Sequence, residues 1–218
     1  MPPTNPPNRL LISFLDLRKS IGYLGATMPI VLVLGNYFTT GATELLNSLS
    51  SYYHSGGRNL FVAILAAIAV FAFSYRGYDK KDNLAGDIAA LSALGIAFFP
   101  TSTDNPDTDV NSVIGIIHIV SAAVFFLTLA YYSLVLFPKT DPSKPMTSQK
   151  KKRNKVYRLS GYLILASLLL IAAYEFFLEE KYINLQDYKL VFWLESLAVM
   201  AFGFSWLTKG EAILADEV

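Results

Sequence analysis

The sequence predicts an all-α integral membrane bundle of six transmembrane helices with both termini cytoplasmic. Hydrophobic residues make up 53% of the chain and charged residues only 16%, whereas about a quarter of the residues of a soluble domain are charged. Six stretches are almost free of charge, and a helix needs about 20 apolar residues to cross a bilayer. The lysines and arginines lie mainly in alternate gaps between these stretches.

The six expected helices occupy residues 20–208, between a disordered lead-in over 1–19 and a cytoplasmic tail over 209–218. Their uncharged stretches run approximately over 21–38, 60–75, 84–100, 112–137, 159–178 and 190–207. No small-residue cleavage site follows the first stretch, so we expect a retained span there and no signal peptide. Pro29 removes a backbone donor and should bend this span. The third stretch is the weakest, because Asp87 lies within it.

The orientation follows from the cations between the spans. Fifteen of the 18 lysines and arginines lie before the first span, after the sixth, or in the second and fourth gaps. Short segments rich in lysine and arginine stay in the cytoplasm. We therefore expect both termini and the basic loop 139–158 inside, and the loop 39–59 outside.

Several classes of site are excluded or disfavoured. Without cysteine, the chain has no disulfide, zinc–thiolate cluster or cysteine nucleophile. The basic run 149–158 would suit nucleic-acid phosphates, but anionic lipid headgroups account for it, so no nucleic-acid partner is expected. Asp104, Asp107 and Asp109 lack the glycine and closing glutamate of a calcium loop. No metal site is predicted, and no cofactor is assigned.

The loop expected outside the membrane contains a first candidate site. Its candidate lipid-binding residues are Tyr52, Tyr53, His54, Arg58 and Asn59. An arginine fork and the backbone amides of a Gly-Gly pair can hold a phosphate, while tyrosines sit at headgroup depth. The alternative is an ordinary interfacial belt of aromatic and polar residues.

Ionisable residues inside the expected spans form a second candidate site. His118, Glu175 and Glu195 should lie at similar depth in the outer half of the bundle. Such groups are costly in hydrocarbon and therefore indicate a site. His118 and Glu195 could act as an acid–base pair, with Ser121, one turn below His118, as nucleophile. A structural hydrogen bond between helices is the alternative.

Short segments of the chain resemble bacterial six-span membrane proteins of unknown function. They are residues 50–54 and 58–61 of the outer loop, 74–78 (SYRGY), and 204–210 (FSWLTKG) with Glu195 before it. Those proteins are distantly similar to the damage-regulated autophagy modulators and the yeast suppressors of phosphatidylinositol-kinase defects. The resemblance implies lipid-related membrane biology and a location in a bacterial inner membrane, and it carries over no catalytic residue. Seven-span lipid hydrolases of the ceramidase type fit less well, because histidines are few and one span is missing.

Two classes of function stay open at this point. One is a non-enzymatic protein that binds lipid headgroups or organises lipid at the outer leaflet, with membrane lipids and a second copy or another protein as partners. The other is a membrane-embedded hydrolase or transferase that uses the His118–Glu195 pair. Acid and base groups must meet within about 3 to 4 Å around a cavity, which distinguishes the two. A transporter is disfavoured, because no internal repeat is evident.

Overall fold

The computed structural model describes residues 13–77, 79–102, 112–140, 143, 145–178 and 187–215. This part of the chain is helical and contains no strand. Its elements are α1 (Phe14–Thr40), η1 (Ser50–His54), α2 (Arg58–Ser74), α3 (Lys80–Phe98), α4 (Ser112–Tyr131), η2 (Tyr132–Leu136), α5 (Ser148–Ala173), η3 (Tyr174–Leu178) and α6 (Leu190–Lys209). η1 is a 3₁₀ turn, whereas η2 and η3 are π-helical turns that extend α4 and α5.

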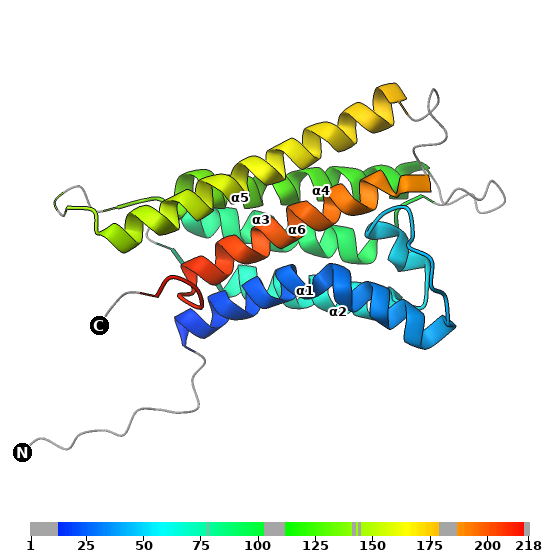
Figure 1. The fold of residues 1–218 in the computed structure, drawn as a ribbon, viewed down its shortest axis with the longest axis horizontal. Helices are drawn as coiled ribbons and strands as arrows, with labels where there is room; N and C mark the ends of the chain where they lie inside the picture. The colour runs from blue at the N-terminus through cyan, green and yellow to red at the C-terminus, as the bar shows by residue number, and fades with distance from the viewer. Residues whose placement is uncertain are drawn as a thin grey trace, which may run out of the picture.

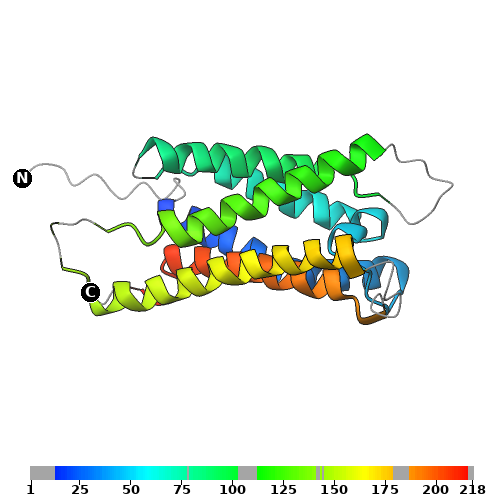
Figure 2. The ribbon, with the colours of Figure 1, turned by 90° about the horizontal axis from the view of Figure 1, so that it is seen from above.

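The long helices form a closed ring. Each contacts its neighbour in the sequence, and α6 returns to pack against α1 (Figure 1). α1 begins and α6 ends at one end of the bundle, which we call the terminal end (Figure 2). The opposite end, which we call the far end, holds η1, the end of α3 and the start of α6. Neighbouring helices therefore run in opposite directions.

Four helical segments are long and apolar enough to cross a membrane. They are Phe14–Thr40, Val113–Leu136, Ser148–Phe177 and Leu190–Lys209, and Arg58–Ser74 is a shorter apolar helix. α3 is not among them, and its first two turns contain Lys80, Lys81, Asp82 and Asp87. The expectation of an all-α bundle is confirmed for the described residues, with four helices that could cross a membrane in place of the six expected.

Two expected boundaries are wrong. α1 begins at Phe14, where Ser13 caps it by accepting a hydrogen bond from the backbone of Asp16, so the end of the expected lead-in is helical. α5 begins at Ser148, so most of the basic run expected in a loop is helical as well. Lysine, arginine and glutamine are good helix formers, but hydropathy detects only the apolar part of such a helix. Pro29 lies within α1, which continues through it to Thr40.

Aromatic side chains fill the terminal end. Trp206 is 2% exposed and lies against Tyr75, Tyr132 and Phe137, with ring centroids 5.1, 5.4 and 5.2 Å away. Tyr157 of α5 packs on Phe137 at 5.3 Å. We call these five residues the aromatic cluster. Because they come from α5, α6 and the ends of α2 and α4, their packing joins these segments through buried ring contacts.

Candidate functional site

The segment between α1 and α2 folds over the far end of the bundle. Serine side chains shape it: the Ser48 hydroxyl accepts from the Ser51 amide at 3.0 Å and bonds to the Ser51 hydroxyl at 2.7 Å. Serine hydroxyls stabilise short turns of this kind by bonding to nearby backbone. Leu49 and Tyr52 then point into the core, where both are buried.

The beginning of α6 holds this segment in place. The Glu195 carboxylate accepts a hydrogen bond from the Leu49 amide at 2.6 Å. The Asn47 carbonyl accepts from the Phe192 amide at 2.9 Å, and the Asn47 side-chain oxygen accepts from the Lys189 ammonium at 2.8 Å. Three bonds between the same two segments fix their relative position.

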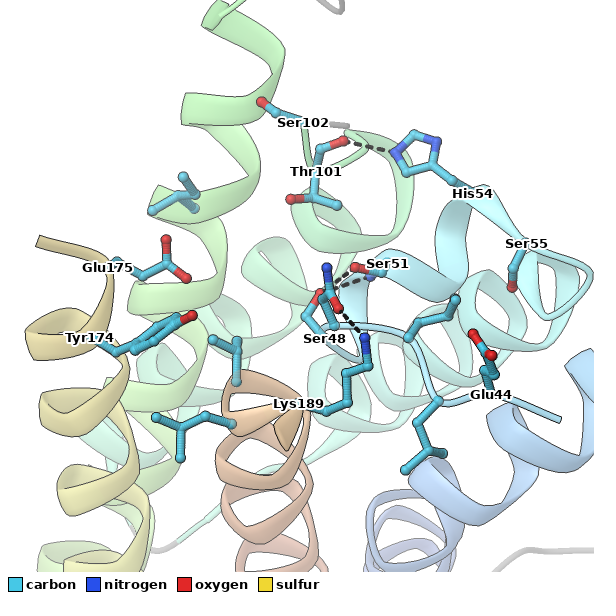
Figure 3. A pocket seen from close by; sticks show the side chains of 16 residues that line it. Glu44, Ser48, Ser51, His54, Ser55, Thr101, Ser102, Tyr174, Glu175 and Lys189 are labelled. Atoms are coloured by element: carbon cyan, nitrogen blue, oxygen red, sulfur yellow. Dashed lines mark hydrogen bonds between the residues drawn. The ribbon is translucent and has the colours of Figure 1, made fainter. Parts of the chain in front are cut away.

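A cavity of about 570 Å³ lies at this end (Figure 3). Its walls come from residues 44–55, which include η1, the residues after α3, one residue of α4, η3 and the start of α6. The side chains that give it its chemistry are Glu44, Ser48, Ser51, His54, Glu175 and Lys189. Its volume falls within the range of about 300 to 1,000 Å³ that is typical of small-molecule sites.

Lys189 holds an unusual position in this cavity. It precedes α6 with a φ of 53°, in the left-handed region that costs a non-glycine residue about 1 kcal/mol or more. Its half-buried side chain lies between the carboxylates of Glu44 and Glu175 in Figure 3, and neither carboxylate forms an ion pair with it among the described residues. Strained residues of this kind are concentrated at functional sites.

His54 lies at the edge of the cavity. Its Nε2 donates to the Thr101 carbonyl at 2.8 Å, which joins η1 to the residues that follow α3 (Figure 3). Of the five residues predicted to bind lipid, it is the one that lines the cavity.

The other four predicted lipid-binding residues lie elsewhere. Tyr52 and Tyr53 are buried, and burial raises the pKa of the Tyr52 phenol. Arg58 and Asn59 are exposed; the Arg58 guanidinium donates to the Tyr53 hydroxyl at 2.9 Å and lies 4.5 Å from the Tyr53 ring centroid. Recognition of a headgroup by Arg58 and Asn59 stays a prediction.

The amides of the glycine pair are already used within the protein. The Gly56 amide donates to the Asn36 side-chain oxygen at 3.1 Å, and the Gly57 amide donates to the Ser55 hydroxyl at 3.0 Å. This leaves Arg58 without the backbone donors that were expected beside it.

The predicted acid–base pair does not form. His118 Nδ1 donates to the Phe99 carbonyl at 2.7 Å, whereas Glu195 bonds to Leu49, and no hydrogen bond or ion pair joins these two described residues. Ser121 packs against Gly95 of α3, where its side chain fills the space of a Cβ atom. The expectation of direct pairing is therefore wrong, because backbone groups of two different segments satisfy the two side chains.

Sequence reasoning missed that Lys189 and Glu44 line the same cavity. Lys189 is one of only three cations in the gaps expected outside, and this scarcity was the available signal. Glu175 was expected at a depth in the bundle similar to that of His118 and Glu195. Nothing in the sequence places it near residues 44–48. No match to this chain is found among family models, curated proteins or solved structures.

Proposed function

We propose that the protein is an integral membrane protein that binds a lipid headgroup in the far-end cavity, at the outer leaflet. One observation carries this proposal. Ile119 of α4 lines the cavity and is also 64% exposed on the outer surface of the bundle. A lipid can thus place its headgroup beside Lys189 and leave its acyl chains along the apolar face of α4.

The exposed surface of the helices supports a membrane location. Large apolar side chains stand on their outer faces, among them Val70 of α2, Leu91 of α3 and Leu169 of α5, at 61%, 74% and 71% exposure. A soluble protein rarely leaves so much apolar surface in water. The exposed leucine of α3 favours six spans over four, and the distribution of cations favours a cytoplasmic terminal end.

The charges of the cavity suit a zwitterionic headgroup. Lys189, with the hydroxyls of Ser48 and Ser51, offers donors to a phosphate. Glu44, which also lines the cavity and is exposed, offers a carboxylate to an amine. An aminophospholipid such as phosphatidylethanolamine carries both groups, a few ångströms apart, and matches this arrangement better than a purely anionic lipid.

Headgroup binding is favoured over a hydrolase or transferase. The enzymatic alternative requires His118 and Glu195 to share a proton, and both are engaged with backbone groups. The resemblance of residues 50–54 and 58–61 to six-span bacterial proteins with lipid-related distant relatives agrees with a lipid-binding role.

Lipids retained through detergent purification test the proposal by native mass spectrometry. Lys189→Gln should lower the occupancy of phosphatidylethanolamine about tenfold, because a charge-assisted hydrogen bond is worth about 1.5 to 3 kcal/mol. Lys152→Gln, at an exposed position of α5 toward the other end, is the matched control and should retain the parent occupancy. Arg58→Gln should have the smaller effect if the cavity, and not the loop surface, holds the headgroup. Equal occupancy in the parent and in Lys189→Gln would refute the cavity site.

A further inference from the structure

The helix at the beginning of α5 divides the basic run between two faces. Lys150 and Arg153 turn toward the bundle: the Lys150 ammonium donates to the Phe137 carbonyl at 2.9 Å, and the Arg153 Nε donates to the Leu214 carbonyl at 2.8 Å. The exposed cations of the run are Lys151, Lys152, Lys155 and Arg158. Among the described residues, no ion pair engages any of these four. The fold thus engages the inward cations and leaves the outward ones to an external ligand.

Three of the exposed cations lie on one line along α5. With 3.6 residues per turn, residues 151, 155, 158, 162 and 169 fall within about 60° of one another around the helix. All five are exposed, and from the terminal end toward the far end they are Lys151, Lys155, Arg158, Tyr162 and Leu169. We call them the outer line of α5. Its order, from cations through a tyrosine to an apolar side chain, matches the headgroup, interface and hydrocarbon of a bilayer.

The length of the helix places this change at the membrane surface. The apolar segment Ser148–Phe177 contains 30 residues, which extend about 45 Å, whereas the hydrocarbon core is about 30 Å thick. Phe176 and Phe177 are exposed and apolar, so the excess length belongs at the start of the helix. There α5 begins beyond the start of α1 and the end of α6 (Figures 1 and 2). Arg158 then lies at headgroup depth, directly before Leu159, which is 61% exposed.

We propose that the outer line of α5 binds an anionic phospholipid, with its phosphate at Lys155 and Arg158 and its acyl chains along Tyr162 and Leu169. Residues three apart on a helix are neighbours, so the two cations reach the same phosphate. The guanidinium offers it a bidentate contact and the ammonium a point charge.

The apolar part of the line favours a lipid over a soluble phosphate. Acyl chains cover such helix faces in a bilayer, so this surface holds a lipid without a cavity. The inference rests on the membrane location proposed above. The site is nevertheless separate from the far-end cavity, because it lies toward the opposite end of the bundle and uses other residues.

Native mass spectrometry of the full chain in a neutral detergent tests the proposal, with phosphatidylglycerol as the probe. The parent should bind this lipid in a saturable way, and more tightly than phosphatidylcholine of the same chain length. Lys155→Gln and Arg158→Gln should each weaken binding about fivefold, as expected for one basic residue near an anionic lipid. The matched control is Lys152→Gln, which removes an exposed charge about 90° around the helix from the line and should bind as the parent does.

A second arm distinguishes the lipid from other ligands. Inorganic phosphate at equal ionic strength should not displace phosphatidylglycerol, because it has no acyl chains. The same spectra report how phosphatidylethanolamine occupancy depends on Lys189, so failure of the far-end site is distinguished from failure of this one. The proposal is overturned if Lys155→Gln and Lys152→Gln bind phosphatidylglycerol alike, or if inorganic phosphate displaces the lipid. It is also overturned if Arg158→Gln separates a lipid-free dimer into monomers, since a second copy of the chain would then occupy the line.

Discussion

The two ends of the bundle both combine aromatic residues with cations, yet they are built differently. At the terminal end, Trp206 and the rest of the aromatic cluster fill the space between the helices, and the cations lie on the rings. At the far end, serines and separated charges surround a cavity of about 570 Å³. Aromatic and basic residues therefore gather at both ends of the bundle. Their presence in the sequence does not indicate whether their side chains pack closely or surround a cavity.

The difference arises from what covers each end. Residues 41–57 cross the far end as a polar segment held by hydrogen bonds to Lys189, Phe192 and Glu195, so that small hydroxyl side chains meet there. At the terminal end, large rings from four segments meet directly. Large rings pack to the density of a protein interior, whereas a hydrogen-bonded polar segment leaves space for a ligand.

The largest expected effect tests the filled end. Trp206→Ala should lower the free energy of unfolding by about 3 to 5 kcal/mol, because it leaves a cavity at the centre of the aromatic cluster. Trp193→Ala on the same helix removes a ring that is 57% exposed and should cost much less. Denaturant unfolding in detergent measures both variants. Similar losses would mean that the terminal end is no better packed than the exposed surface of α6.

The next effect tests how the polar segment is held. Glu195→Leu should cost about 1 to 3 kcal/mol, because the Leu49 amide loses its acceptor. Glu195→Gln keeps an acceptor oxygen in the same place and should cost clearly less. Thermal unfolding compares the two variants. If they are equally stable, the bond to Leu49 does not hold the segment over the cavity.

A smaller effect of opposite sign tests the strain at Lys189. Lys189→Gly should raise the free energy of unfolding by up to about 1 kcal/mol, since glycine adopts a φ of 53° without steric cost. The same variant should lose the bound headgroup together with the ammonium. Unfolding and lipid occupancy are measured on one preparation. A variant that loses stability would show that the bond from Lys189 to Asn47 outweighs the backbone strain.

The smallest effect is a dependence of terminal-end stability on pH. The Lys139 ammonium donates to the Asp79 carboxylate at 3.0 Å and holds the pKa of Asp79 below its ordinary value near 3.8. A lowered folded-state pKa adds stability that is fully present above the unfolded-state pKa. This stability is lost as the pH falls from about 4 through the folded-state pKa.

The corresponding measurement is the melting temperature between pH 6 and pH 3, a range set by the ordinary pKa of about 3.9 for an aspartate. Asp79→Asn should reduce the acid-induced fall slightly, and Lys139→Gln should do the same. The double variant should add nothing to Lys139→Gln alone, because that change already removes the partner of Asp79. An additive response would mean that Asp79 and Lys139 contribute independently to the acid-induced fall in melting temperature, although their atoms are in contact in the structure.

Sequence reasoning predicted the helices well and the contacts between them poorly. Runs of apolar residues identify six helices, since burial in lipid or in a core requires them, and the start of α6 agrees at Leu190. The start of α5 was missed, because its first turns contain the basic run. The pairing of His118 with Glu195 was wrong, because depth along a helix does not determine which way a side chain points. The cavity could not be predicted, since five segments that lie far apart in the sequence form its walls.

The π-helical turn at the end of α5 makes the cavity sensitive to chain length. Tyr174 and Glu175 begin η3, and both line the cavity. A π-helical turn contains one residue more than the α-helical turn it replaces, and each residue of a helix advances it by about 100°. Deletion of one residue from η3 would restore a regular helix and turn one wall of the cavity away from Lys189. The insertion or deletion of one residue in η3 could therefore change the shape of this cavity without altering the packing of the long helices.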